Sequence, residues 1–179
     1  MRRRGTSLVE LLIVMVLIGI MTTIAAPRLL QSSKGTVEQN ARLLAQGMDM
    51  ARTRAYSART LVRVVVTDTV WQSFLDQNRD SVIAETATER TAFGVMSTRL
   101  FETGVVLGRG SASRIPGDTA TTPVGTRRIA FGARGTTEPF GTGTVLYLTH
   151  NSDATAVSAV EITPAANVKV WRWVDGAWQ

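Results

Sequence analysis

A single carboxylate near the start of a long apolar segment is the residue whose chemistry is hardest to explain by packing. Glu10 follows three arginines at positions 2–4 and precedes sixteen uncharged residues, Leu11–Ala26. A charge at the centre of a bilayer costs about 2.5–3.5 kcal/mol on insertion scales, and less near the edge. A cation makes such a carboxylate tolerable, and a free α-amino group, with a pKa near ~8, is one. Glu10 is therefore predicted to act in processing and assembly.

The N-terminal segment allows three interpretations. A secretory signal peptide has the same basic start and apolar run, but Glu10 interrupts the run, and Pro27 follows the small-residue stretch Ile24–Ala26. A plain membrane anchor needs about 20 apolar residues. Thr6–Ala26 is long enough if Glu10 lies at the interface, and the arginines would then stay cytoplasmic.

The third interpretation rests on a motif. The run Gly5-Thr6-Ser7-Leu8-Val9-Glu10 resembles the type III signal of type IV pilins and pseudopilins, with Thr6 where the family usually has Phe. The resemblance implies cleavage after Gly5 by a prepilin peptidase and N-methylation of Thr6. It also implies that Glu10, fifth in the mature chain, meets the amino terminus of a neighbouring subunit and sets the register of assembly. The alternative for Glu10 is that it extends to the lipid headgroups without a specific partner. Pro27 stands where the family has a helix-kinking proline.

Two polar segments could in principle bind metal or catalyse a reaction. Asp76–Asp80 has oxygen-bearing side chains at positions one, three and five of a calcium loop, but Ser81 and Ala87 replace the Gly and Glu that the loop needs. His150, the only histidine, lies near Asp153, yet no nucleophile elbow or phosphate-binding loop is present. Both segments are predicted to be polar turns, with calcium as the alternative for the first. We expect no cofactor and no enzymatic activity.

Arginines concentrated in the middle of the chain indicate a different class of function, DNA binding. Asp118 is the only acid between them, and they are Arg109, Arg114, Arg127, Arg128 and Arg134. Basic loops can supply phosphate contacts. However, the net charge of +6 comes from 20 basic and 14 acidic side chains, and removing the three leader arginines leaves 17 against 14, or +3. The C-terminal segment Trp171–Gln179 is aromatic rather than basic. A solvated basic face is therefore the simpler interpretation.

The elements that must position these residues follow from composition and periodicity. With 179 residues, 44% hydrophobic and no cysteine, the chain can fold as one domain without disulfides. An apolar stripe at alternating spacings of four and three predicts a helix, and it consists of Val37, Ala41, Leu44, Met48, Ala51, Ala55 and Ala58. From Leu61 a period of two predicts a hairpin, with strands Leu61–Thr67 and Val70–Leu75 around Asp68-Thr69.

Further strands are expected after the hairpin, at Val105–Leu107, Arg127–Phe131, Thr144–Thr149, Ala156–Ile162 and Val168–Val174. Alternation places Trp171 and Trp173 on one face of the last of these, where core packing is expected. The resulting fold class is α+β: a long N-terminal hydrophobic helix packed on an antiparallel sheet or small β-sandwich. Its expected parts are a leader at 1–5, a transmembrane and assembly helix at 6–26, its amphipathic continuation at 27–60 and a β-rich head at 61–179.

The head also resembles a known group. The helix over residues 51–57, the hairpin and Ile129-Ala130-Phe131-Gly132 with Gly135 are similar to H-type minor pseudopilins and FimT-like minor pilins. The resemblance implies a structural subunit of a type II secretion pseudopilus, or alternatively of a type IV pilus, with DNA binding in competence as a further alternative. It implies other subunits, the prepilin peptidase and the bacterial inner membrane as partners. The chain would cross that membrane once, with a cytoplasmic N-terminus and a periplasmic head.

Overall fold

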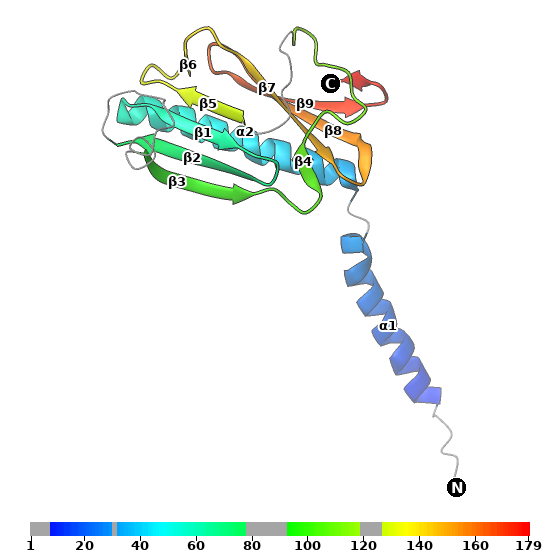
Figure 1. The fold of residues 1–179 in the computed structure, drawn as a ribbon. Coiled ribbons are helices and arrows are strands. Elements are labelled where there is room, and N and C mark those ends of the chain that lie inside the picture. The colour runs from blue at the N-terminus through cyan, green and yellow to red at the C-terminus, as the bar shows by residue number, and fades with distance from the viewer. Residues whose placement is uncertain (1–7, 30–31, 78–92, 119–126) are drawn as a thin grey trace. The chain divides into compact units, whose positions relative to one another are not determined.

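The computed structural model describes residues 8–29, 32–77, 93–118 and 127–179 (Figure 1). The chain divides into two compact units with the boundary between Ser32 and Ser33. The first unit contains helix α1, and the second contains helix α2 and the ten strands that the structure describes. Each unit is described by itself.

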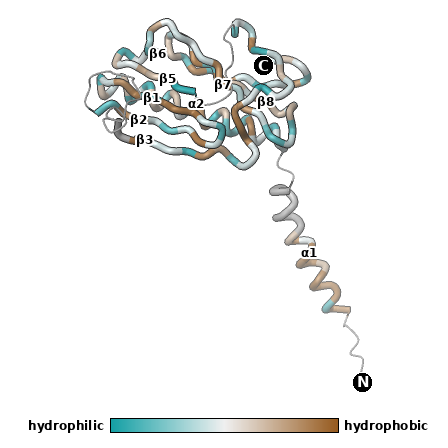
Figure 2. Tube along the Cα trace, in the orientation of Figure 1, coloured by the Kyte–Doolittle hydropathy of each residue, from teal (hydrophilic) through white to brown (hydrophobic). Residues whose placement is uncertain are grey.

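Helix α1 spans Leu8–Leu29, and over residues 8–21, whose side chains are described, Glu10 is the one charged residue in an otherwise apolar sequence. Its side chains from Leu8 to Met21 are exposed, and Figure 2 shows the hydrophobic colouring along this part of the helix. In the part of the chain that the structure describes, no helix has both the length and the apolar character needed to cross a membrane.

Helix α2 spans Ser33–Ala58, and its apolar stripe confirms the sequence prediction. Six of the seven stripe positions are buried, and the seventh, Ala58, is half-buried. The helix ends where Arg59 adopts a left-handed φ of 51° and the Thr60 amide donates to the Ala55 carbonyl at 3.2 Å. This bond satisfies a carbonyl that the last helical turn would otherwise leave without a partner.

The first sheet has five antiparallel strands in the order β3-β2-β1-β5-β6. Its strands are β1 Val62–Val66, β2 Val70–Asp76, β3 Phe93–Leu100, β5 Arg127–Phe131 and β6 Thr137–Glu138. The predicted hairpin is confirmed, since β1 and β2 pair from Val62–Leu75 to Val66–Trp71. The pairing of β2 with β3 contains a bulge, because Ser73 faces Ser97 while Phe74 faces Val95.

The second sheet also has five antiparallel strands, in the order β10-β9-β8-β7-β4. Its strands are β4 Val105–Leu107, β7 Thr144–His150, β8 Asp153–Ile162, β9 Val168–Val174 and β10 Ala177–Trp178. All five further strands that the sequence predicts, including β5 of the first sheet, are present with nearly the same bounds. Strands β3, β6 and β10 were not predicted.

The main core lies where both sheets pack on α2. It joins the α2 stripe with Val64 of β1, Phe131 of β5, Leu146 of β7 and Val160 of β8. Small side chains on α2, such as Ala51 and Ala55, let the strands approach the helix closely. At roughly 1.5–3 kcal/mol for each large aliphatic or aromatic side chain buried, this core is the main source of stability in the second unit.

Candidate functional site

Glu10 lies in the first turn of α1, on an exposed face that it shares with Leu11, Val14, Met15 and Ile18. Residues four apart stack on one side of a helix, so Glu10 forms the charged end of an apolar stripe. A carboxylate in the first turn is also favoured by the helix dipole, by about 0.3–1 kcal/mol. The arrangement suits contact with an apolar partner that brings one positive charge.

The other N-terminal residues singled out from the sequence are only partly described. Gly5 and Thr6, the predicted cleavage and methylation positions, lie outside the described residues. Pro27 lies in the last turn of α1, which ends at Leu29, and α2 starts at Ser33. A kink at Pro27 therefore stays a prediction.

The five arginines considered for DNA binding lie on different elements. Arg109 and Arg114 are on the loop after β4, which folds over the second sheet, whereas Arg127 and Arg128 belong to β5 of the first sheet. Arg134 is in the turn between β5 and β6. Burial lowers the pKa of Arg127, and the charge of Asp118 opposes this shift. The acid between the arginines thus lies close enough to act on one of them.

The polar loop after β7 is a network of turn contacts. The His150 Nδ1 atom lies 2.8 Å from Ser152 Oγ, and Asp153 Oδ1 accepts hydrogen bonds from the amide and hydroxyl of Thr155. The Thr155 contacts lower the pKa of Asp153. These side chains therefore bond to residues two positions further along the chain, as turn-forming side chains do.

The predicted turn at Asp76–Asp80 is described only at its start. Asp76 ends β2, is buried, and donates its amide to the Leu61 carbonyl at 2.9 Å. Residues 78–80 lie outside the described part of the chain. Within that part, no cluster of three or more His, Cys, Asp or Glu side chains could hold a metal ion.

Two of the C-terminal tryptophans, Trp171 and Trp178, pack against a second hydrophobic cluster, as core packing was expected for Trp171. Trp171 and Trp173 do not join the main core, because the alternate residues Val168 and Val170 of β9 face it instead. Trp171 packs in a separate cluster with Tyr147 and half-buried Trp178. The Trp173 and Trp178 rings lie 5.1 Å apart between centroids. The period of two was read correctly, but it could not say which face of the strand meets α2.

The loop after β4 packs over the cluster of Tyr147, Trp171 and Trp178, which is called the outer cluster below. The Ile115 amide donates to the Tyr147 hydroxyl at 3.1 Å, and that hydroxyl donates to Asp118 Oδ2 at 2.6 Å. Burial raises the pKa of Tyr147 to about 12, and the hydrogen bond to Asp118 acts in the same direction. Trp178 Nε1 donates to the Ser113 carbonyl at 3.0 Å. The outer face of the second sheet is thus covered by the chain itself.

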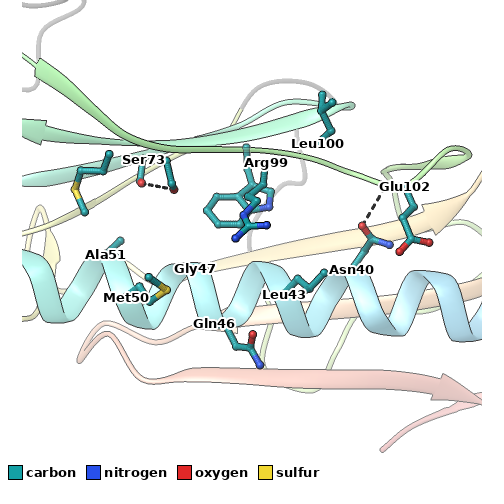
Figure 3. A pocket seen from close by; sticks show the side chains of 13 residues that line it. Asn40, Leu43, Gln46, Gly47, Met50, Ala51, Ser73, Arg99, Leu100 and Glu102 are labelled. Atoms are coloured by element: carbon teal, nitrogen blue, oxygen red, sulfur yellow. Dashed lines mark hydrogen bonds between the residues drawn. The ribbon is translucent and has the colours of Figure 1, made fainter.

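An apolar groove lies between α2 and strand β3, and sequence reasoning missed it (Figure 3). Its volume is about 290 Å³. Leu43 and Met50, two helical turns apart on α2, form one side and are 46% and 70% exposed. Met96, the extra residue in the bulge of β3, contributes to the other side. Leu43 and Met50 lie off the α2 stripe, and their spacing of seven was the one signal in the sequence.

The floor of the groove is held by close packing. A Cβ atom at Gly47 would lie 2.2 Å from the Trp71 ring, so only glycine lets this ring reach the helix. Trp71 is 6% exposed. On the strand side, the Ser73 and Ser97 hydroxyls are 2.8 Å apart and join β2 to β3 across the groove wall.

Buried Asn40 fixes one end of the groove. Its Nδ2 donates to the Thr36 carbonyl at 2.8 Å, and its Oδ1 accepts from the Glu102 amide at 3.1 Å. The side chain therefore ties the segment after β3 to α2. In Figure 3, Arg99 points toward α2 and Leu100 points away from it. The groove is thus a largely apolar surface whose lining also includes two charged residues, Arg99 and Glu102.

Two comparisons with known proteins gave matches, one for a short N-terminal motif and one for the fold. Residues 1–26 match the prokaryotic N-terminal methylation motif. No curated protein sequence matches the chain. The fold is similar to the type IV minor pilin FimU of Pseudomonas aeruginosa strain PAO1, with a TM-score of 0.51 and 15% identity over 75% of this chain and 87% of that chain. A second crystal form of FimU gives a TM-score of 0.49 and 14% identity, over 74% and 90% of the two chains.

Proposed function

We propose, from the premise that this chain is type IV pilin-like in its N-terminal motif and its fold, that it is a minor structural subunit of a membrane-anchored filament. The observation that carries the proposal is the pairing of a methylation motif at residues 1–26 with a helix-and-two-sheet head. The chain would contribute packing surfaces to the filament and would catalyse no reaction.

Processing is the first step of the proposed function. A prepilin peptidase would cut after Gly5, and Thr6 would become the methylated amino terminus. The apolar run Thr6–Ala26 begins two residues before α1 and would hold the subunit in the inner membrane with its head in the periplasm. Once in the filament, Glu10 would pair with the amino terminus of a neighbouring subunit, because an unpaired carboxylate in apolar surroundings is costly.

Two assemblies are candidates for the filament. The hairpin β1–β2 and the Ile129–Gly132 segment favour an H-type subunit of a type II secretion pseudopilus, and this remains the first candidate. The likeness of the fold to a type IV minor pilin supports the second, a type IV pilus. Deleting the gene separates them: loss of protein secretion with intact pili identifies the first, and loss of pili with intact secretion identifies the second.

The proposal is tested by mass spectrometry of the chain extracted from membranes. The expected chain lacks Met1–Gly5 and carries one methyl group on Thr6. Glu10→Ala should insert into the membrane as before but enter filaments poorly, because the charge pair is lost. An intact amino terminus at steady state contradicts the proposal, and normal incorporation of Glu10→Ala contradicts the role of Glu10.

DNA binding in competence is kept as a separate alternative. The arginines lie on three different elements, and Asp118 acts on Arg127, so the described part of the chain offers weak support for one basic face. A gel shift at low salt with the unit Ser33–Gln179 is expected to show no complex. A complex that weakens with salt would favour DNA binding.

A further inference from the structure

Strand β3 differs from the other sheet edges. Among the strands that the structure describes, three of the four edge strands, β4, β6 and β10, have only two or three residues, and short edges discourage pairing with other chains. β3 has eight residues, Phe93–Leu100, without proline or lysine. Val95 and Leu100 on it are 62% and 77% exposed. An edge of this kind is suited to pair with another strand.

The helix beneath this edge is also incompletely covered. In the described part of the chain, β3 is the last strand of the first sheet on this side, and Leu43 and Met50 of α2, which line the groove with it, are exposed. Neighbouring strands lie about 4.7–4.9 Å apart. One more strand would lie at this distance beyond β3, and its side chains on the α2 side would be directed toward the groove.

We propose that an extended segment of a different filament subunit docks as this additional strand. It would pair with Ser97–Leu100, the regular part of the edge beyond the bulge at Met96. Its side chains would alternate between the Leu43–Met50 surface on one face and Leu100 on the other. The inference rests on the proposed function, and it names the surface through which this subunit contacts a neighbour.

The charge on the edge identifies the kind of partner. Arg99 is the only charged residue of β3, it points into the groove, and among the described residues no acidic side chain forms an ion pair with it. In an antiparallel pair of two copies over Ser97–Leu100, each Arg99 would lie opposite Thr98 of the other copy, so no carboxylate would face it. A segment with apolar residues at alternate positions and a carboxylate opposite Arg99 complements the edge. The occupant is therefore a different subunit.

Site-specific cross-linking tests the proposal, because the chain has no cysteine of its own. Met50→Cys and Leu100→Cys, in the full-length chain in its native membranes, are labelled with a thiol-reactive benzophenone and irradiated. The matched control is Tyr56→Cys, since Tyr56 is on the same helix as Met50 and is 64% exposed against 70%. We expect both probes to label one short segment of another chain that carries an N-terminal methylation motif, at alternating positions, and the control not to label it.

Arg99 variants test the charge. Arg99→Glu should reduce the yield of the Met50 product by about tenfold or more, because a like charge then faces the partner carboxylate, whereas Arg99→Lys should retain most of it. A cross-linked dimer of this chain, a partner without the motif, equal labelling from Tyr56→Cys, or no product overturns the proposal. The N-terminal mass is measured on the same samples. A processed chain without the product refutes only this docking surface, whereas an unprocessed chain refutes the proposed function and the inference with it.

Discussion

The two sheets of the head have five described strands each and pack on the same helix, but they differ in the length and covering of their edge strands. The second sheet has edge strands of two and three residues, and the loop after β4 covers its outer aromatic cluster through Tyr147 and Trp178. The first sheet ends in the eight-residue β3, beside exposed apolar residues of α2. Among the described residues, the outer cluster of the second sheet is thus covered by the loop after β4, while the first sheet ends in a long strand without a neighbour on one side.

The largest expected effect is a difference in stability between variants that lose a tryptophan from the first sheet and from the second. Trp71→Ala in the first sheet should lower the free energy of unfolding by about 3–5 kcal/mol, because it leaves a cavity against Gly47. Trp173 is half-buried on the outer face of the second sheet, so Trp173→Ala should lower the free energy of unfolding clearly less. Urea unfolding of the unit Ser33–Gln179, followed by circular dichroism, measures both. Equal losses would mean that the two surfaces contribute alike to the core.

The next effect concerns the attachment of β3 to α2. Asn40→Ala removes the acceptor of the Glu102 amide and should lower the free energy of unfolding by about 1–3 kcal/mol. Asn40→Asp keeps that acceptor and serves as the control, although it loses the bond to the Thr36 carbonyl. The same urea experiment measures both variants. If both unfold like the parent chain, Asn40 does not hold the edge in place.

The pH dependence of stability tests the contribution of Tyr147, which connects the loop after β4 to the second sheet. Tyr147 has a folded pKa of about 12 against an ordinary value of 10.0, so its contribution to stability is present below pH 10 and is lost between about pH 10 and 12. Tyr147→Phe should therefore lose less stability than the parent over this range. Tyr56→Phe, at an exposed tyrosine, should follow the parent curve. Urea midpoints between pH 8 and 12 measure the difference, and identical curves for all three chains would contradict it.

The smallest effect on the free energy of unfolding is expected from a substitution on the edge strand β3. Leu100→Lys should change the free energy of unfolding by no more than about 0.5 kcal/mol, because the side chain is 77% exposed. A lysine on an edge strand discourages pairing, so incorporation into the filament should still fall. Comparing urea unfolding with filament incorporation measures the two separately. Full incorporation of the folded variant would show that this edge is not needed.

Much of the fold could be predicted because its signals are local. The four-three spacing of the α2 stripe and the alternation in β1, β2 and β7–β9 each follow from which face of one element is buried. Strand β3 was missed because Phe-Gly-Val-Met-Ser-Thr-Arg-Leu does not alternate and contains a bulge at Met96. Strands β6 and β10 have only two residues, which is too short for a period to appear.

The sequence by itself determined the N-terminal signal, the apolar helix behind it and the succession of one amphipathic helix and most of the strands. Each of these depends on neighbours within a few residues. Only the tertiary structure decided that β3 is an edge among the described strands, that Gly47 accepts the Trp71 ring, and that Trp171 faces away from the main core. These features depend on strand order and on contacts between distant segments, and no local period in a sequence records which strand has no neighbour.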